Sequence, residues 1–114
     1  MSRLKRMPEK IVNCDVFVCD VSIIGTINTR HGSRAMPNSN VLFELGYALK
    51  KHGWRRIIMI LNSAFGRVEE LPFDLRMKRV IVYEVQEEFQ DKASVRRTLE
   101  TRLRGALQEI FSVA

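Results

Sequence analysis

Two short runs of apolar residues constrain the fold of this chain more than any other feature. Residues 16–20 (VFVCD) and 57–61 (IIMIL) are rich in β-branched side chains and show no regular alternation with polar ones. Such runs are typical of strands covered on both faces, which occur mainly in parallel sheets. They predict a sheet enclosed between helices.

The segments between and after these runs supply the expected helices. Apolar residues recur at helical spacing from residue 41 to 49, and Gly53 follows where a helix should end. Residues 80–83 (VIVY) predict a third strand, and apolar positions repeat every three or four residues from 95 to 110. The alternation of strands and helices predicts an α/β fold with a parallel sheet, and 114 residues suit one domain, 1–114.

Residues 24–40 have a different composition, rich in Gly, Ser and Asn, with Pro37 near the end. We expect a loop of about sixteen residues, a length at which loops in compact domains are usually functional or disordered.

Bulk composition narrows the class of protein. No run reaches the roughly 18 apolar residues of a membrane span, and no signal-peptide core follows the basic N-terminus, so a cytoplasmic protein without membrane partner is expected. The net charge is +6, but Lys and Arg are scattered through residues 3–10, 50–56, 76–79 and 96–104. This scatter favours solvated surface over a nucleic-acid interface, and the positive field also suits a nucleotide's phosphates.

The two cysteines bracket the first strand. Residues five apart on one strand point to opposite faces and lie about 16 Å apart, so Cys14 and Cys19 are not expected to form a disulfide. No CxxC pair or neighbouring His completes a zinc set. Buried thiols, and no metal site, are the expectation.

Polar residues follow the first two strands directly. Asp20 and Ser22 come at the end of the first strand, and Asn62 and Ser63 at the end of the second. Ligands of open parallel sheets bind at the carboxyl ends of the strands, where these side chains should gather.

Glu44 lies beside the edge of the apolar arc of the first helix. If Asn38 or Asn40 is the N-cap, we expect Glu44 in the first turn, where the helix terminus favours a carboxylate and partial burial opposes its ionisation. A fixed carboxylate can stabilise the oxocarbenium-like transition state of N-glycosidic bond cleavage. Spacing alone leaves open the alternative that Glu44 only satisfies the helix terminus.

The run RAMPNSNVLFELGYA (residues 34–48) resembles the signature of prokaryotic TIR-like (Toll/interleukin-receptor-like) nucleotide-binding proteins. It is also similar to the N-x-x-x-ELGYA motif of nucleoside 2-deoxyribosyltransferases. The flanking segments CDVFVCDVS (14–22), LPFDLR (71–76) and RVIVY (79–83) resemble the TIR-like group, so the likeness covers about two thirds of the chain. The central motif is specific and the flanks are weaker.

This resemblance implies a flavodoxin-like sheet and a catalytic role for Glu44. In TIR-like enzymes the matching glutamate cleaves the nicotinamide–ribose bond of NAD, which is a substrate and not a cofactor. In the transferases it is the nucleophile toward C1′ of a deoxynucleoside. Asp20 matches an acidic position that lines the base or ribose pocket, with capping of loop amides as its alternative role.

For the other candidate residues, a structural role is the alternative to substrate binding. Asn38 and Asn40 are candidates for contacts with ribose hydroxyls or for capping the helix, and Tyr47 for stacking on a base or for packing. Ser22 is a further candidate for substrate binding. Structural roles are favoured for the remaining conspicuous residues, namely His31, Trp54, Asp74 and Arg76.

The chain also departs from the family. TIR-like domains begin with a strand and loop that have no counterpart before residue 16, so we expect a domain that lacks its N-terminal strand and helix. Self-association is expected by analogy. Three functions stay open: a TIR-like NAD-cleaving module of an antiphage or stress response, a deoxyribosyltransferase, and a non-catalytic nucleotide-sensing or assembly module.

Overall fold

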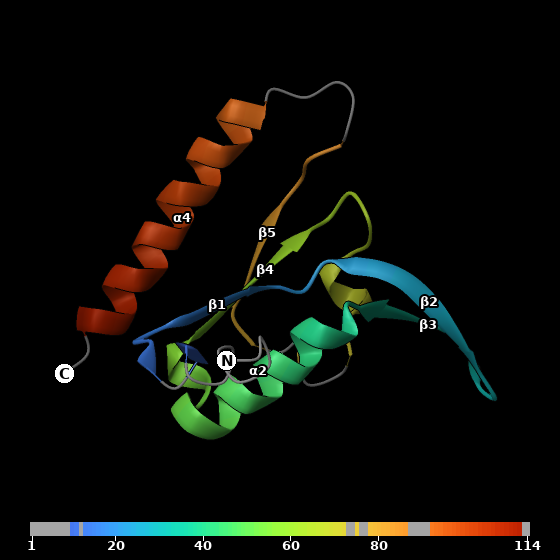
Figure 1. Cartoon of the computed structure of the whole chain (residues 1–114). Helices are drawn as coiled ribbons and strands as arrows, with labels where there is room; N and C mark the ends of the chain where they lie inside the picture. The colour runs from blue at the N-terminus through green and yellow to red at the C-terminus, as the bar shows by residue number, and fades with distance from the viewer. Residues whose placement is uncertain (1–9, 12, 73–74, 76–77, 87–91, 113–114) are drawn as a thin grey trace.

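The computed structural model describes residues 10–11, 13–72, 75, 78–86 and 92–112 (Figure 1). Two 3-10 helices, η1 (Trp54–Arg56) and η2 (Val68–Glu70), accompany the main elements. In chain order these are β1 (Phe17–Asp20), β2 (Ile23–Thr29), β3 (Gly32–Pro37), α2 (Ser39–His52), β4 (Ile57–Asn62), β5 (Val80–Tyr83) and α4 (Lys92–Ser112).

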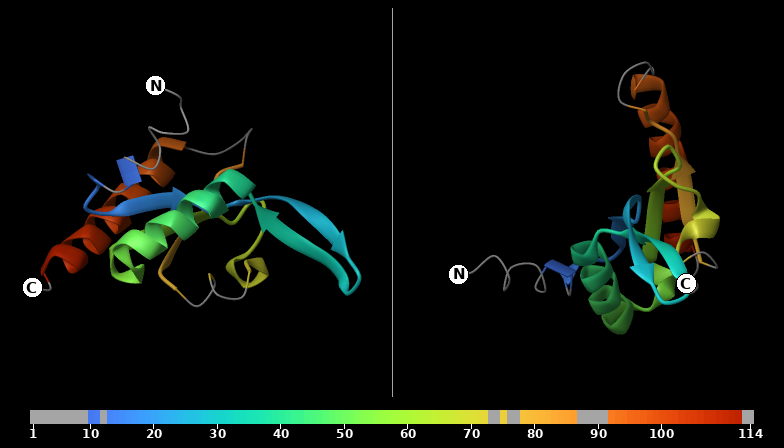
Figure 2. Two further views of the ribbon diagram at one scale, coloured as in Figure 1. Left: turned by 60° about the horizontal axis from the view of Figure 1, so that its bottom comes forward. Right: turned by 90° about the vertical axis from the view of Figure 1, so that its right-hand side faces the viewer.

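Three of the strands form a parallel sheet in the order β1-β4-β5. Phe17 pairs with Ile57, and Met59 pairs with Val80 on the other side of β4. The helices α2 and α4 flank this sheet on opposite sides (Figures 1 and 2). The molecule therefore has a flavodoxin-like α/β fold, which confirms the predicted class and all three predicted parallel strands.

The core is centred on β4, the middle strand. Ile57, Ile58, Met59 and Leu61 are each at most 1% exposed. Alternate residues of β4 pack with α2 in one cluster, and Ile58 points to the opposite face of the sheet. Burial of each such side chain contributes roughly 1.5–3 kcal/mol, so β4 fixes the position of both neighbouring strands.

The edge strand β1 is less covered than its sequence predicts. Cys19 is buried on the α2 side, whereas Val18 is 43% exposed and Asp20 is exposed. Coverage on both faces is therefore confirmed for β4 and wrong for β1 within the described residues. On the α4 side, contact comes mainly from β5, where the Arg102 guanidinium donates to the Val82 carbonyl at 2.6 Å.

The helix α2 begins two residues earlier than expected. Asn38 is its N-cap, and its side-chain oxygen accepts a hydrogen bond from the Asn40 backbone N–H at 2.8 Å. Gly53 ends it as expected, with φ of 73° and a backbone bond to the Leu49 carbonyl. The first turn contains no acidic residue, so Glu44 lies in the second turn and its predicted place was wrong.

The predicted loop at residues 24–40 is also wrong, because its greater part is the antiparallel hairpin β2–β3. The Thr29 hydroxyl closes the turn by donating to the Gly32 carbonyl at 2.6 Å and accepting from the His31 N–H. Gly32 has φ of 113°, a conformation that favours glycine. The hairpin projects away from the three-stranded sheet (Figures 1 and 2), and its largely exposed side chains explain the loop-like composition.

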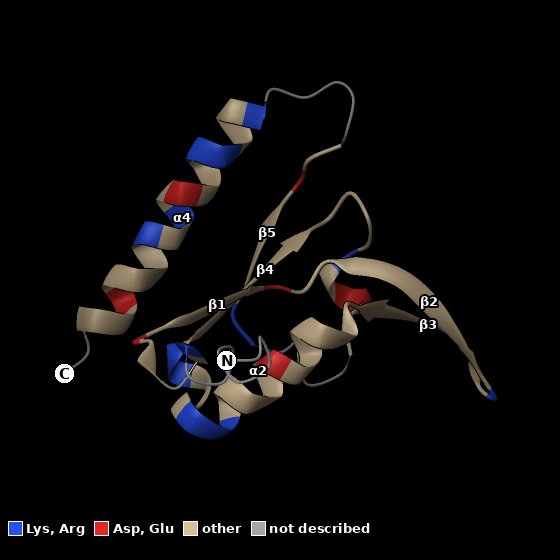
Figure 3. Ribbon diagram, in the orientation of Figure 1, with Lys and Arg blue, Asp and Glu red and all other residues tan. Residues whose placement is uncertain are grey.

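Charged residues are distributed over separate elements. Figure 3 shows Lys and Arg along α4, at the C-terminal end of α2 and at the hairpin tip, with no single basic face among the described residues. Within the same residues, no helix is long and apolar enough to cross a membrane.

Candidate functional site

The carboxyl ends of β1, β4 and β5 meet in one hydrogen-bonded network. Asp20, the last residue of β1, accepts bonds from the backbone N–H and the hydroxyl of Ser22. Its other oxygen accepts from the Tyr83 hydroxyl at 2.7 Å. The Ser22 hydroxyl in turn accepts from the Asn62 backbone N–H at 2.7 Å. The predicted gathering of Asp20, Ser22 and Asn62 is therefore present, and Tyr83 joins it.

Asn62 is the one buried polar residue of the described part of the chain, at 6% exposed. Its side-chain oxygen accepts from the Val85 and Ala64 backbone N–H groups, and its amide donates to the Val85 carbonyl at 3.0 Å. Because its oxygen accepts two hydrogen bonds and its amide donates one, Asn62 holds the segments after β4 and β5 together at the sheet edge. Ser63 is tied to the neighbouring strand, where its hydroxyl donates to the Tyr83 carbonyl.

Tyr83 holds the carboxylate of Asp20 in place. Burial, together with the hydrogen bond to Asp20 and that carboxylate's charge, raises the pKa of Tyr83 to about 12, while a hydrogen bond with Ser22 acts in the opposite direction. The phenol therefore stays protonated at neutral pH and donates to Asp20. Asp20 caps the loop amide of Ser22, as its structural alternative predicts, and is still exposed to solvent.

Glu44 is a half-buried residue of α2 whose charge acts on β1. The link is Cys19: its pKa is raised to about 12 by burial first, then by the charges of Asp20 and Glu44. Both carboxylates are therefore near the same buried thiol. Glu44 is half-buried, and among the described residues it forms no ion pair or hydrogen bond.

The position of Glu44 changes the electrostatic interpretation. The attraction of a helix N-terminus fades within the first turn, and Glu44 lies beyond it. Glu44 is half-buried and has no described cationic partner.

The other predicted substrate-binding residues on or next to α2 differ in their exposure and in their hydrogen bonds. Tyr47 follows Glu44 by one turn on the same side of α2 and is 39% exposed, as expected for the more exposed flank. Asn38 is engaged in capping, which confirms its structural alternative. Asn40 is exposed at the start of the helix.

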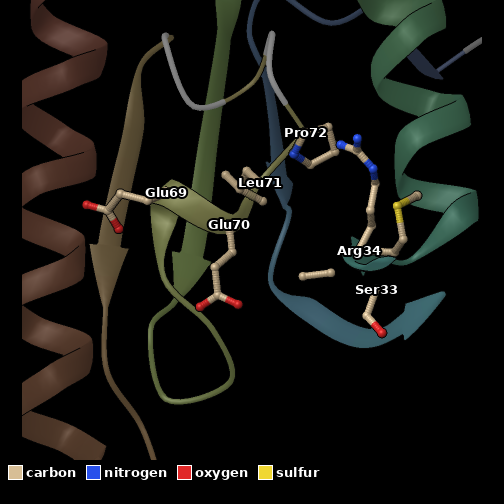
Figure 4. A pocket seen from close by; sticks show the side chains of 8 residues that line it. Ser33, Arg34, Glu69, Glu70, Leu71 and Pro72 are labelled. Atoms are coloured by element: carbon tan, nitrogen blue, oxygen red, sulfur yellow. The ribbon is translucent and has the colours of Figure 1, made fainter. Parts of the chain in front are cut away.

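Three pockets among the described residues lie away from Glu44 and Asp20. The pocket in Figure 4, of about 510 Å³, lies between β3 and η2 with Arg34 and Glu70 among its lining residues. A second, of about 650 Å³, is largely apolar and lies beside Leu42 and Trp54. A third, of about 270 Å³, lies between β5 and α4. None of these three pockets is lined by Glu44 or Asp20.

The structure describes two of the four residues for which structural roles were expected. Trp54 is half-buried against the core just after α2, with the Lys78 ammonium 5.2 Å from its ring. His31 is exposed at the hairpin tip. Asp74 and Arg76 lie outside the described residues, and the nearby Arg79 pairs with Glu109 at 3.9 Å.

One contact between two residues was not predicted from the sequence. Cys14 is only half-buried, and its sulfur lies 3.7 Å from Nε2 of His52 at the end of α2. The two residues are 38 positions apart, so no local spacing indicates the contact. The expectation that both thiols are buried holds for Cys19 and is wrong for Cys14. Both cysteines are free, and no group of three or more metal-ligating side chains occurs in the described part.

Comparisons of the chain with models of protein families, with curated proteins and with solved structures gave no match. The likeness of residues 34–48 to TIR-like proteins therefore stays a prediction from sequence.

Proposed function

We propose that this chain is a TIR-like nucleotide-binding module that hydrolyses the nicotinamide–ribose bond of NAD, with Glu44 as its catalytic carboxylate. The observation that carries the proposal is the environment of Glu44: it is half-buried, has no described cationic partner, and lies on α2 close enough to Cys19 of β1 for its charge to act on that thiol. Ligands of parallel α/β sheets bind at this edge. The motif around Glu44 links the module to antiphage or stress responses.

The chemistry needs a fixed negative charge. When the bond between nicotinamide and C1′ breaks, positive charge develops on the ribose ring, and neutral nicotinamide leaves. A carboxylate beneath C1′ stabilises that charge until water adds to the sugar and loses a proton. Glu44 suits this role because its charge is not offset by a described Lys or Arg.

Two neighbouring groups would orient the nucleotide. Asp20 is exposed, and Oδ2, which accepts one bond from Tyr83, keeps a lone pair for a ribose hydroxyl. The partly exposed ring of Tyr47, one turn from Glu44, offers a face for stacking on a base. The net charge of +6 favours approach of the pyrophosphate.

A second candidate is a non-catalytic nucleotide-sensing or assembly module. It is favoured by the three described pockets, none of which is lined by Glu44, and by exposed aromatic side chains on α2. Phe43 is 73% exposed and Tyr47 39% exposed, a pattern found where helices contact partners.

The direct test is an assay for free nicotinamide with NAD and purified protein, comparing wild type with Glu44→Gln. We expect the variant to lose at least about 100-fold in rate, the scale at which one electrostatic group contributes to a transition state. Glu69→Gln is a matched control, because Glu69 is an exposed carboxylate in a pocket away from Glu44. Its rate should equal that of wild type.

The other outcomes separate the alternatives. Base exchange between deoxynucleosides without nicotinamide release would identify a deoxyribosyltransferase. Nucleotide binding without turnover in either assay would identify the non-catalytic module. Glu44→Gln should leave the melting temperature almost unchanged, since Glu44 forms no described hydrogen bond, and a large fall would make Glu44 a structural residue.

A further inference from the structure

The two carboxylate oxygens of Asp20 differ in how many hydrogen bonds they accept. Oδ1 accepts two, from the backbone N–H and from the hydroxyl of Ser22. The Asn62 backbone N–H donates to the same hydroxyl at 2.7 Å, which leaves the hydroxyl proton for Asp20. Oδ2 accepts one bond, from the Tyr83 hydroxyl at 2.7 Å. Because a carboxylate oxygen has two lone pairs, Oδ2 keeps one acceptor position, and it belongs to an exposed residue.

The phenol oxygen of Tyr83 is a second acceptor beside Oδ2. Burial and the bond to Asp20 raise the pKa of Tyr83 to about 12, so the phenol keeps its proton at neutral pH and donates it to Asp20. A hydroxyl oxygen that donates its proton still has two lone pairs, and the bond with Ser22 takes up no more than one of them. Two acceptor oxygens therefore lie 2.7 Å apart at the carboxyl ends of β1 and β5.

Two adjacent acceptors select a ligand that offers two adjacent donors. The two hydroxyls of a cis-diol stand on neighbouring carbons, and their oxygens lie about one hydrogen-bond length apart, which matches the spacing of Oδ2 and the phenol oxygen. A sugar that lacks one of the two hydroxyls can satisfy only one acceptor. An anionic group is repelled by the Asp20 carboxylate, which has no ion-pair partner among the described residues.

We propose that Asp20 and Tyr83 together bind the vicinal diol of a ribose, which makes the site selective for ribonucleosides over 2′-deoxyribonucleosides. This inference rests on the proposed function, in which Glu44 acts on C1′ of the same sugar. The charges of Asp20 and Glu44 both act on the Cys19 thiol, so the diol acceptors and the catalytic carboxylate lie around one residue of β1. Tyr83 has two roles: its oxygen accepts from one hydroxyl, and its proton fixes the direction of Oδ2 for the other.

The test measures Kd by calorimetry on the full chain with Glu44→Gln, for NAD and for NAD whose nicotinamide ribose lacks the 2′-hydroxyl. Kd is the suitable readout, because loss of this hydroxyl also changes the intrinsic reactivity of the glycosidic bond. We expect NAD to bind about tenfold more tightly, the scale of one hydrogen bond. Adding Tyr83→Phe should reduce this preference to about threefold or less. Ser63→Ala is the matched control, because the Ser63 hydroxyl donates to the Tyr83 carbonyl and not to the Asp20 carboxylate, and it should keep the full preference.

Asp20→Asn is a second variant that does not depend on the folding of Tyr83→Phe. Because the Ser22 groups donate to the position of Oδ1, the asparagine carbonyl should take that place and its amide should replace the acceptor Oδ2, which also reduces the preference.

The outcomes separate this inference from the proposed function. Equal Kd values for the two dinucleotides, no measurable binding of either, or a preference that survives both Tyr83→Phe and Asp20→Asn would overturn the diol site. Equal Kd values together with Glu44-dependent release of nicotinamide would overturn the diol site and leave the hydrolase intact. A preference that depends on Tyr83, in a protein whose wild type releases no nicotinamide, would support the diol site and overturn the hydrolase.

Discussion

The two ends of the same parallel sheet are built differently. At the carboxyl end, Asp20, Ser22, Asn62 and Tyr83 come from three strands and form a connected set of hydrogen bonds. At the amino end, Cys14 and His52 share a single carbonyl acceptor. The first arrangement holds polar groups in fixed directions, and the second places a half-buried thiol and an imidazole on the same carbonyl oxygen.

This contrast bears on function. A site that stabilises a developing charge needs groups whose positions are fixed before the reaction. The carboxyl end, where Glu44 and Asp20 lie near Cys19, meets that need better than the amino end.

Replacing Asn62 with Ala should have the largest effect on folding. The change leaves the Val85 N–H and carbonyl and the Ala64 N–H without their partner at a buried position. We expect a loss of about 2–4 kcal/mol in the free energy of unfolding, measured in urea. Asn28→Ala is the control, because the exposed Asn28 side chain accepts a bond from the exposed Ser33 hydroxyl in the hairpin, and its loss should cost at most about 0.5 kcal/mol. Equal losses of stability in the two variants would show that Asn62 stabilises the fold no more than an exposed hairpin residue does.

Alkaline pH should weaken the fold through Cys19. Its pKa is raised from the ordinary 9.0 to about 12 in the folded state, so the unfolded chain releases this proton first. The stabilisation is present below pH 9 and is lost as pH rises from about 9 to about 12, by an amount on the order of a few kcal/mol. Tyr83 acts in the same direction above its ordinary pKa of 10.0.

Unfolding measured at several pH values checks this sign. Cys19→Ala should flatten the alkaline decline, whereas Cys14→Ala should leave it in place. A decline that is as steep in Cys19→Ala as in wild type would contradict the assignment of the buried thiol.

Tyr83→Phe should have the smallest effect. It removes one hydrogen bond to Asp20, an exposed carboxylate that water can solvate instead, so we expect a loss of about 1 kcal/mol or less. The reaction of Cys14 with iodoacetamide should not change, since the two residues lie at opposite ends of the sheet. A change in that rate would show that the ends are coupled.

The polar residues at the carboxyl end of the sheet could be predicted, because the topology of a parallel sheet brings the ends of its strands to one edge. Once residues 16–20 and 57–61 are recognised as parallel strands, Asp20 and Asn62 must lie at the same edge. Tyr83 was missed although it ends the predicted third strand, so its place in the chain already carried the signal. The central strand was predicted well because burial on both faces leaves an unbroken apolar run.

Other features depend on contacts that spacing does not encode. Asn38 and Asn40 were both candidate caps, and with Asn38 as the cap the first turn ends before Glu44, contrary to the prediction. The hairpin was missed because Ile24 and Ile27 are exposed, 69% and 50%, and give no pattern of burial. His52 meets Cys14 only because α2 is 14 residues long and returns to the start of β1.

The central claim is that the charge of Glu44 acts on the sugar of a bound nucleotide. The most direct measurement gives kcat for nicotinamide release and the Kd for NAD side by side, for wild type and Glu44→Gln. We predict that kcat falls at least about 100-fold while Kd changes less than about threefold. Equal turnover in the two proteins would contradict the account.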